Sequence, residues 1–502
     1  MEQLTKAKNT ILYPYQAQAV TAIWEVIKGK NPAKLIYQLP TGGGKTLIFS
    51  ELAKRYVRQS GKKVLILTHR VELSVQTEEV LQRQELSTLL ISNKVKEIDQ
   101  NNYDCFVAMI ETLHNRLDEN CFDLSQIGMI IVDEAHYNYF RKIFRYFAGC
   151  NLIGFTATPI SSNIHLPLSK DYDQILVGEN ISALVEQGYL TKAITYTFDV
   201  DLKSLKIGIN GDFTVSSSEK LYSSELMMSK LLHAYEDRAK GKKTLIFNSS
   251  INTSRLVEQF FIERGYDHKI QHLDSTFSDR ERKQVLEWFN KTKGAILTSV
   301  GILTTGFDEP SVEVILLNRA TRSIALYHQM VGRGSRIYPN KKNFYIIDLG
   351  NNAKRFGLWE DVIDWHKVFK NPTWFLEQHF YKEENELDFS SYERPNEIAE
   401  RFPNTPENPD IHIRNLYKEC SRKQQKTILV IDQCIENHLE WIQFNASVLD
   451  DALELFVLLK EEIQYRIHAY GKCINASNNY LNWLTETYEK KIERALYLHY
   501  DE

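Results

Sequence analysis

The chain of 502 residues has few cysteines, no long apolar run and no low-complexity block. No apolar stretch approaches the roughly 20 residues that a membrane-spanning helix needs, and no apolar segment of the signal type follows the first charges. We therefore expect a cytoplasmic protein. Zinc sites and disulfide frameworks are not expected, because no Cys-x-x-Cys pair occurs. The cysteines stand alone, at Cys105, Cys121, Cys150, Cys420, Cys434 and Cys473.

The composition is typical of a folded protein, with 43% hydrophobic and 25% charged residues. This length predicts two to four domains. Residues 371–502 contain 14 Lys and Arg against 24 Asp and Glu, a net charge of −10, whereas the rest of the chain has +6. The mildly basic front suits binding of a polyanion, and the acidic tail does not share that task.

Short apolar strands alternate with helical stretches through the first 350 residues, a pattern typical of βαβ units on parallel sheets. The strands form two sets, which predict two α/β domains at residues 1–163 and 231–356. The first set is Lys34–Gln38, Val64–Thr68, Phe106–Met109, Gly128–Val132 and Leu152–Thr156. The second set is Thr244–Asn248, Ala295–Ser299, Val312–Asn318 and Phe344–Asp348.

Two stretches depart from this alternation. Residues 164–230 are predicted to be a connector, in which Asn210-Gly211 favours a hairpin. This hairpin is expected to be either a surface connection or a wedge that splits a duplex. Residues 357–502 predict an acidic, mainly helical C-terminal region, with a mixed linker over 371–409 and helices over 446–470 and 480–497. The helices are predicted to make either a small docked bundle or a surface for a protein partner or self-association.

A glycine-rich turn, Thr41-Gly42-Gly43-Gly44-Lys45-Thr46, follows an apolar strand and opens a helix predicted over 47–56. Glycines let the backbone wrap a phosphate, so that N–H groups and the helix N-terminus point at it. Lys45 is expected to meet the β- and γ-phosphates of ATP, and Thr46 to place its hydroxyl on Mg²⁺.

An acidic motif, Asp133-Glu134-Ala135-His136, follows another apolar strand. We expect Asp133 to be a metal ligand at the end of that strand, and Glu134 to orient and deprotonate the attacking water. His136 is predicted to relay between a nucleotide site and a nucleic-acid site. Thr156 and Thr158 end the next strand, and we expect them to bond the acidic motif and couple it to the second domain.

The second domain carries Gln329-Met330-Val331-Gly332-Arg333-Gly334-Ser335-Arg336, with two arginines predicted to lie one helical turn apart. Fixed guanidinium groups suit the charge on a transferring phosphoryl group, so Gln329, Arg333 and Arg336 are predicted to be catalytic. The upstream polar loop is expected to touch the nucleotide through Gly306 and Asp308, and nucleic acid through Thr304 and Thr305.

These elements, in this order, resemble those of superfamily 2 helicases and translocases of the DEAD/DEAH-box class over about residues 10–355. The resemblance implies an α/β fold with two tandem RecA-like parallel-sheet domains, followed here by an α-helical C-terminal domain. Within that superfamily the chain resembles the bacterial RadD-type helicases. It differs from them in having no cysteine cluster after the motor. The similar segments are Tyr13-Pro14-Tyr15-Gln16, Leu303–Asp308, Tyr327–Gly334 and Tyr345–Asp348 followed by Asn351.

The resemblance also implies the contacts of the two ligands. Gln16 would read the adenine edge of ATP. Nucleic acid would be held by side chains that follow the strands, namely Thr68, Arg70, Thr112, Asn248, Ser249 and Ser275. Hydroxyl, amide and guanidinium groups suit phosphate and sugar, so binding is expected to be indifferent to sequence and weakened by salt.

We therefore predict an ATP-dependent and Mg²⁺-dependent helicase or translocase that acts on DNA in repair, recombination or defence. The first alternative is a double-stranded DNA translocase that works in a restriction or defence complex without separating strands. An RNA helicase is the second alternative. A different class of protein, an ATP-gated scaffold that recruits partners through its acidic tail, is the third.

Overall fold

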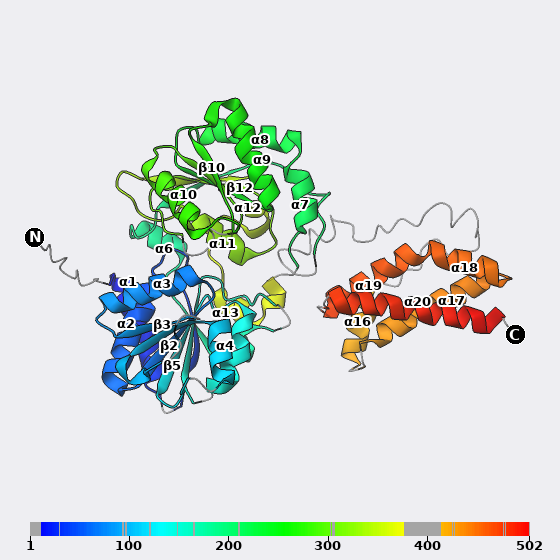
Figure 1. Cartoon of the computed structure of the whole chain (residues 1–502), viewed down its shortest axis with the longest axis horizontal. Coiled ribbons are helices and arrows are strands. Elements are labelled where there is room, and N and C mark those ends of the chain that lie inside the picture. Colours follow the sequence, from blue (N-terminus) through cyan, green and yellow to red (C-terminus); the bar gives the residue numbers. More distant parts are fainter. Residues whose placement is uncertain are drawn as a thin grey trace, which may run out of the picture. The chain divides into compact units, whose positions relative to one another are not determined.

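A computed structural model describes residues 12–375 and 413–500, with gaps at 30, 93–94, 96–97, 120–121, 148, 164–165, 209–210, 302, 304–306, 424, 426, 475 and 477 (Figure 1). The chain divides into two compact units. The larger unit contains two α/β domains, and the smaller one is formed mainly by the C-terminal helices. The predicted fold class, two parallel-sheet α/β domains with a helical C-terminal region, is confirmed.

The first domain is built on a seven-stranded parallel sheet with the order β3-β4-β2-β5-β6-β1-β7. Its central strands are buried apolar runs, as expected for a sheet covered on both faces by helices. The strands β5, β6 and β1 are neighbours, so the loops that follow them open side by side. The strands are β1 (Lys34–Gln38), β2 (Lys63–Thr68), β3 (Thr88–Ile91), β4 (Cys105–Met109), β5 (Ile127–Asp133), β6 (Asn151–Thr156) and β7 (Gln174–Val177).

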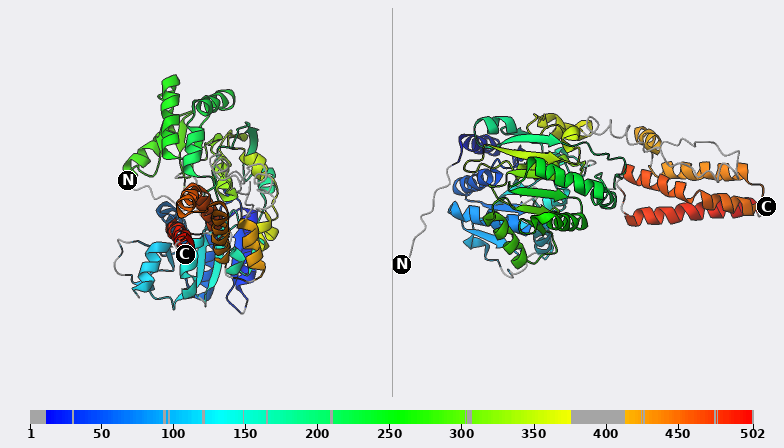
Figure 2. Two further views of the ribbon diagram at one scale, coloured as in Figure 1. Left: turned by 90° about the vertical axis from the view of Figure 1, so that its right-hand side faces the viewer. Right: turned by 90° about the horizontal axis from the view of Figure 1, so that it is seen from above.

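The helices of this domain cover the sheet and position its loops (Figure 2). The helix after the glycine-rich turn starts at Lys45, with Gly44 as its N-cap in the left-handed region at φ 80°. Only glycine adopts that conformation at no steric cost, which explains why the sequence has glycine there. The helices are α1 (Pro14–Ile27), α2 (Lys45–Ser60), α3 (Val71–Arg83), α4 (Ile110–Asp118), α5 (Arg141–Phe144) and α6 (Ile181–Glu186).

The second domain is a six-stranded parallel sheet with the order β10-β11-β9-β12-β13-β8. All four strands predicted for this domain are present. The strands are β8 (Lys192–Thr197), β9 (Thr244–Asn248), β10 (Ile270–Leu273), β11 (Ile296–Ser299), β12 (Val314–Asn318) and β13 (Asn343–Asp348). The helices are α7 (Val215–Tyr222), α8 (Glu225–Arg238), α9 (Ile251–Phe261), α10 (Asp279–Lys291), α11 (Ile324–Gly332) and α12 (Asn352–Phe356). The helix α13 (Trp365–Lys370) follows them in the chain and packs against β7 of the first sheet.

The stretch predicted as a connector contributes a strand to each sheet. The strand β7 pairs with β1 of the first domain, and β8 pairs with β13 of the second. Both are edge strands with few fully buried residues, which is why their sequences lack the apolar runs that mark the central strands. The chain crosses between the domains through α6 and the residues that follow it.

The predicted hairpin is reduced to a short bridged loop. Backbone bonds run from Gly208 N to Asp212 O (2.8 Å) and from Thr214 N to Lys206 O (2.7 Å). The second arm then stops, because the Thr214 hydroxyl accepts a bond from Ser217 N and caps α7, which begins at Val215. Asn210 lies outside the described residues.

The helical unit has its own core, formed by buried faces of four helices and part of a fifth. The predicted helix over 446–470 is two helices, because the chain turns at Leu459, and the helix predicted over 480–497 is longer at both ends. The linker predicted over 371–409 lies mostly outside the described residues. The helices are α16 (Ile413–Arg422), α17 (Leu429–Asn445), α18 (Leu449–Leu458), α19 (Lys460–Ile474) and α20 (Asn478–Tyr500).

Within the part of the chain that the structure describes, no helix combines the length and the apolar character needed to cross a membrane.

A buried ionic network joins three helices of this unit. Glu462 Oε1 receives bonds from Arg466 Nε (3.0 Å) and Nη2 (2.5 Å), one turn further along α19. His438 of α17 lies 3.4 Å from the same oxygen and contacts the Tyr488 hydroxyl of α20 at 2.8 Å. Burial alone would raise the pKa of Glu462, but His438 and Arg466 hold it at about 2. The carboxylate is therefore charged and compensated by its partners.

We predict that Arg466→Met destabilises the helical unit by about 3–5 kcal/mol, because it leaves the buried Glu462 carboxylate without its main partner. Hydrogen exchange over residues 429–500, followed in urea, measures this effect. Lys490→Met is the matched control, since Lys490 forms an exposed 3.8 Å pair with Glu486 in the same unit. The control should change stability by less than about 0.5 kcal/mol. Equal effects of the two substitutions would contradict the assignment.

Candidate functional site

The glycine-rich turn forms a loop between β1 and the first turn of α2, as the sequence predicts for a phosphate-binding loop. Gly42 and Gly44 both have positive φ, at 88° and 80°. The Lys45 ammonium donates to the Leu39 carbonyl (3.3 Å) and therefore lies back along the loop. Thr41 Oγ1 is buried and has no hydrogen-bond partner among the described residues. A loop with this geometry presents backbone N–H groups and a free hydroxyl to an anion.

Gln16 packs directly on this loop. Its Nε2 lies 3.3 Å from the Gly43 carbonyl, and its Oε1 accepts a bond from Tyr13 N (2.9 Å) in a capping box at the start of α1. The Tyr15 hydroxyl donates to the same Gly43 carbonyl (2.8 Å). The structure thus places Gln16 beside the predicted nucleotide site, with its amide engaged by the loop itself.

The acidic motif stands at the end of β5, beside the loop. Asp133 is buried, and its Oδ1 accepts a bond from Glu134 N (3.0 Å). Burial raises the pKa of Asp133, and the Glu134 carboxylate adds to that rise. Burial works in the same direction on Glu134, but Lys45 and His136 hold its pKa below the usual range. Glu134 has φ 52°, a strained conformation for a residue with a side chain and one found most often at functional sites.

The coupling residues lie next to this pair. His136 Nδ1 lies 3.3 Å from Glu134 Oε2 and 3.0 Å from the Thr156 hydroxyl. Thr156 in turn donates to the Thr158 carbonyl (3.1 Å). The contact predicted between the acidic motif and the hydroxyls of the next strand is therefore present, through His136, and all four side chains are largely buried.

These residues fit a divalent cation. Burial and the neighbouring Glu134 carboxylate both disfavour the charged form of Asp133, and a cation held by Asp133 would stabilise that form. Hard oxygen ligands of this kind suit Mg²⁺. Asp133 and Thr46 would hold the ion, which would neutralise phosphate charge. The Thr41 hydroxyl, which has no hydrogen-bond partner among the described residues, lies in the same glycine-rich loop as Thr46.

The arginine pair of the second domain does not lie on a helix, and this prediction is wrong. The helix α11 ends at Gly332, and Arg333 is its C-cap. Bonds from Gly334 N to Val331 O and from Ser335 N to Gly332 O turn the chain there. A side chain at Gly334 would meet Phe344 of β13 at 2.4 Å, so this close approach requires glycine. The arginines therefore project from a turn rather than from one face of a helix.

Both arginines are held by the loop of their own domain that contains Phe307 and Asp308. Arg333 Nη1 donates to the Phe307 carbonyl (2.6 Å), and Arg336 Nη1 donates to the same oxygen (3.2 Å). Arg336 also pairs with Asp308 at 2.5 Å. Burial lowers the pKa of Arg333, and the Glu134 carboxylate of the first domain acts against that change. Glu134 of the first domain is thus among the charged groups that act on Arg333.

The two α/β domains meet at the glycines of the two motifs. A Cβ on Gly332 would lie 2.6 Å from Thr41 Cβ, and one on Gly42 would lie 3.0 Å from Ser335 Oγ. The backbone of residues 329–336, the arginine segment, therefore contacts residues 41–46, the phosphate loop, directly. Tyr137, which follows the acidic motif, lies beside Gln329 of α11. The predicted halves of the site, 288 residues apart between Lys45 and Arg333, are brought together.

The predicted nucleic-acid residues of the first domain follow β2 and β4. The Thr68 hydroxyl is buried and bonded to Ser74 (2.6 Å), so it shapes the loop rather than facing outward. Arg70 reaches the Gly301 carbonyl of the second domain (3.4 Å). Thr112 lies half-buried in the first turn of α4. Of these three, Arg70 has the position best suited to a phosphate.

The predicted nucleic-acid residues of the second domain lie in different environments. Asn248 is fully buried, and its amide bonds the Thr298 hydroxyl (2.8 Å) and receives Asn318 Nδ2 (2.8 Å). This differs from the predicted direct contact, because the amide fixes neighbouring strand ends instead. Ser249 is partly buried, and Ser275 is exposed beyond β10. Thr304, Thr305 and Gly306 lie outside the described residues.

Sequence reasoning missed Lys341. Its ammonium donates to the Pro310 carbonyl (3.0 Å) and to the Arg336 carbonyl (2.8 Å), and so ties the arginine segment to the loop at Phe307. Burial lowers its pKa to about 7. No motif surrounds this residue, and no local signal in the sequence marks it.

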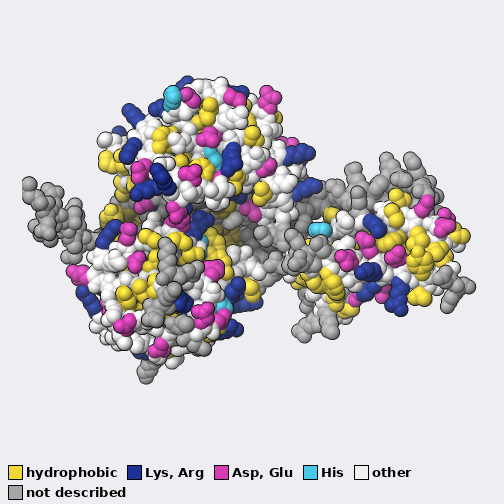
Figure 3. All heavy atoms as spheres, viewed as in Figure 1, with side chains coloured by type: hydrophobic (Ala, Val, Ile, Leu, Met, Phe, Trp, Pro, Cys, Tyr) yellow, Lys and Arg dark blue, Asp and Glu magenta, His cyan; other side chains and the backbone are white. Residues whose placement is uncertain are grey.

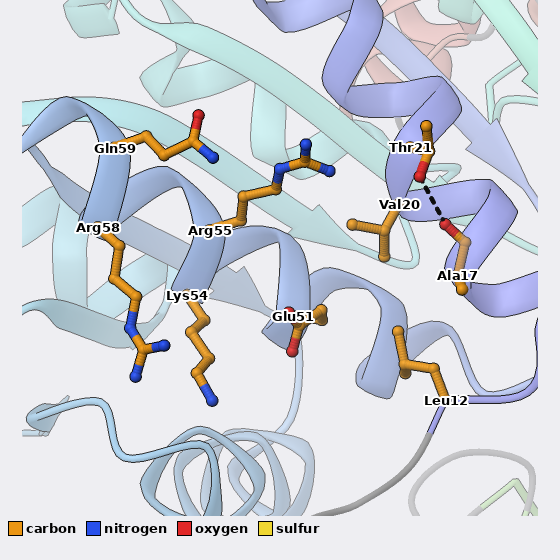
Figure 4. A pocket seen from close by; sticks show the side chains of 9 residues that line it. All are labelled: Leu12, Ala17, Val20, Thr21, Glu51, Lys54, Arg55, Arg58 and Gln59. Atoms are coloured by element: carbon orange, nitrogen blue, oxygen red, sulfur yellow. Dashed lines mark hydrogen bonds between the residues drawn. The ribbon is translucent and has the colours of Figure 1, made fainter.

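A shallow cavity of 390 Å³ lies elsewhere on the first domain, between α1 and α2. Figure 4 shows the side chains of Lys54, Arg55 and Arg58 along α2, with Glu51 among them. Arg55 stacks over the Trp24 ring at 4.7 Å, and Arg58 pairs with Glu85 at 3.4 Å. None of the predicted site residues lines this cavity.

The structure thus has two α/β domains, with the glycine-rich loop of the first in contact with the arginine-containing turn of the second. Comparison with known proteins agrees. Residues 9–161 match the family model "Type III restriction enzyme, res subunit", and residues 226–338 match "Helicase conserved C-terminal domain". These two matches, one to each α/β domain, support a superfamily 2 helicase.

The individual relatives have low sequence identity to this chain. IRC3 of Saccharomyces cerevisiae, described as a candidate ATP-dependent helicase, is 29% identical over 366 residues, covering 67% of this chain and 51% of that protein. A subunit of the EcoAI type I restriction endonuclease of Escherichia coli is 24% identical over 401 residues, covering 70% of this chain and 48% of the subunit. The chain thus spans about half the length of these relatives.

Among solved structures, a fragment of a candidate HsdR subunit of a type I restriction enzyme from Vibrio vulnificus has the same fold. Its TM-score is 0.54 at 21% identity, and the match covers 68% of this chain and 65% of the fragment.

We predict that Gly332→Ala weakens binding of ATP, because its methyl group would collide with Thr41 and force the arginine segment away from the phosphate loop. Overpacking of this kind costs about 1–3 kcal/mol, or roughly 5- to 150-fold in affinity. Titration with a fluorescent ATP analogue measures the change. Gly149→Ala is the control, since nothing lies within 4 Å of a methyl group there. Unchanged affinity in Gly332→Ala would contradict the contact.

Proposed function

We propose that the protein is an ATP-dependent motor that moves along nucleic acid as a helicase or translocase. The observation that carries this proposal is the divided site. The phosphate loop of one domain lies under the arginine segment of the other, and Arg333 acts electrostatically on Glu134. A site completed only by two domains couples hydrolysis to their relative movement.

Each residue has a role that its surroundings support. The phosphate loop and Lys45 bind the phosphates, and Gln16, which packs on that loop, reads the nucleobase edge. Glu134, charged because Lys45 and His136 lower its pKa, orients the water and accepts its proton. Arg333 and Arg336 stabilise charge on the transferring phosphoryl group once they leave the Phe307 carbonyl. Bound Mg²⁺ supplies neutralisation of phosphate charge.

We infer that the nucleic acid is DNA and that the protein acts in the cytoplasm in repair, recombination or defence. Support comes from the match of the first domain to a restriction-enzyme subunit and from the restriction-enzyme relatives. Arg70, which spans from the first domain to Gly301 of the second, lies where a strand would pass from one domain to the other.

A second candidate is translocation on duplex DNA within a multi-protein complex, without strand separation. Its support is the exposed hydrophobic surface of the helical unit, seen as yellow patches in Figure 3. Phe444 is 75% exposed, Val448 54% and Leu498 64%. The bond from the Tyr500 hydroxyl to the Ala446 carbonyl (2.8 Å) brings the ends of α17 and α20 together. Such a surface suits a protein partner or self-association.

The rate of ATP hydrolysis with different nucleic acids is the experiment that tests the proposal. We expect single-stranded or forked DNA to stimulate turnover and RNA to have little effect. Strongest stimulation by blunt duplex, without strand displacement, would favour the second candidate. Stimulation by RNA alone would replace DNA by RNA as the substrate. No stimulation by any of them would favour an ATP-gated scaffold.

Three substitutions test the site within that assay. Lys45→Ala should abolish ATP binding, and Glu134→Gln should keep binding but lower turnover by roughly 100- to 10,000-fold, because it removes the general base. Arg333→Ala should lower kcat more than it raises KM, since the arginine acts on the transition state. His233→Phe, at an exposed position on α8, serves as the control. Near-normal turnover in any of the three would remove that residue from the mechanism.

A further inference from the structure

His69 lies between the residues predicted to hold nucleic acid and has no assigned role. Its neighbours are engaged elsewhere. Thr68 bonds Ser74, and Arg70 reaches Gly301 of the second domain. The imidazole nitrogens of His69 are both buried, and neither has a hydrogen-bond partner among the described residues.

An imidazole always has hydrogen-bonding needs at both nitrogens. The neutral ring carries one donor and one acceptor, and leaving either unpaired in a buried place costs about 1–3 kcal/mol. Burial lowers the pKa of His69 to about 4, so the ring is neutral at pH 7. A polar partner that the protein itself does not provide is therefore required beside this ring, and water is the simplest one.

The position of His69 relates it to the hydrolytic carboxylate. Its ring packs on Tyr137, with ring centroids 4.6 Å apart, and Tyr137 packs on His136 at 4.2 Å. His136 lies 3.3 Å from Glu134 Oε2. Glu134 also acts electrostatically on His69 directly. A continuous set of rings thus runs from the segment 68–70 to the acidic motif.

Other unsatisfied polar atoms gather in the same region. Besides both nitrogens of His69, the buried polar atoms without a hydrogen bond of full geometry include Thr41 Oγ1, and also Glu134 Oε2 and Gln329 Nε2, whose side chains contact His136 and Tyr137. They come from the phosphate loop, the acidic motif and the second domain. Buried polar atoms are rarely left unpaired, and a group of them from separate elements indicates a place that receives polar ligands.

The segment that carries His69 is also where the two domains hold each other. Besides the bond from Arg70 to Gly301, Glu72 at the start of α3 pairs with Arg282 of α10 in the second domain. Any change in the spacing of the domains, or any strand gripped by Arg70, therefore acts on residues directly next to His69.

We propose that His69 is a positioning residue that joins the nucleic-acid-contact segment 68–70 to the water oriented by Glu134, through a hydrogen bond to a bridging water. Grip on the strand then sets the rate of hydrolysis. The proposal rests on the motor function proposed above and names the element that makes its hydrolysis depend on nucleic acid.

The test compares His69→Phe, which keeps a ring against Tyr137 but removes both nitrogens, with His69→Gln, which restores a hydrogen-bonding group. The control is His233→Phe, the same substitution at the exposed site on α8. The full chain is assayed for kcat and KM of ATP hydrolysis, with and without single-stranded DNA. Affinity for a fluorescent ATP analogue and thermal melting are measured alongside.

We expect His69→Phe to lower the DNA-stimulated kcat by roughly 5- to 100-fold, the range of one lost hydrogen bond in a buried site, with KM for ATP within about threefold of the wild type. His69→Gln should recover part of that loss. His233→Phe should match the wild type.

Three outcomes overturn the proposal. Stimulated turnover in His69→Phe within about twofold of the control would remove the hydrogen bond from the coupling. Early melting of both His69 variants would show that the ring only fills space. Stimulation absent from the wild type itself would contradict the motor function as well, whereas stimulation that survives only in the wild type and His233→Phe supports both.

Discussion

The contact between the Gly332 backbone and the Thr41 side chain is the constraint on which the rest of the motor depends. A methyl group at Gly332 would lie 2.6 Å from Thr41, so the arginine segment can approach the phosphate loop only without a side chain there. Gly42 meets Ser335 in the same way, at 3.0 Å. Because two glycines allow this approach, Arg333 comes close enough to influence Glu134. The distance between the two domains therefore decides which residues the site contains.

The charged groups of the same region are stabilised by specific partners. Asp133 and Glu134 are buried together, and Lys45 is the main positive charge that stabilises Glu134 as a carboxylate. The arginines are held back by one carbonyl, that of Phe307, and by Asp308. Lys341 holds that arrangement in place through its bonds to the Pro310 and Arg336 carbonyls. In the proposed function this arrangement receives a phosphate and a cation, while the arginines are bonded within their own domain.

The central strands and the loops that follow them were predictable, because a buried parallel strand is an apolar run and a phosphate loop has a local glycine signature. The strands β3, β7, β8 and β10 were not predicted, since they are short or lie towards sheet edges and carry mixed sequences. The helical placement of Arg333 and Arg336 was wrong for a tertiary reason, because Gly334 packs on Phe344 and the chain must turn there. Asn248 follows a strand as predicted, yet its amide forms hydrogen bonds with Thr298 and Asn318.

By itself the sequence determined the chemistry of the chain: a phosphate loop, an acidic motif and an arginine segment, each encoded by a few consecutive residues at the end of a strand or helix. Only the tertiary structure decided which of these groups meet. The order of the strands placed β5, β6 and β1 side by side, and the packing of two separate domains brought Gly332 onto Thr41. It also left the His69 nitrogens buried and unpaired, a property that no local pattern contains. The physical reason is that local motifs depend on backbone geometry over a few residues, whereas burial, pKa and pairing depend on atoms contributed by distant parts of the chain.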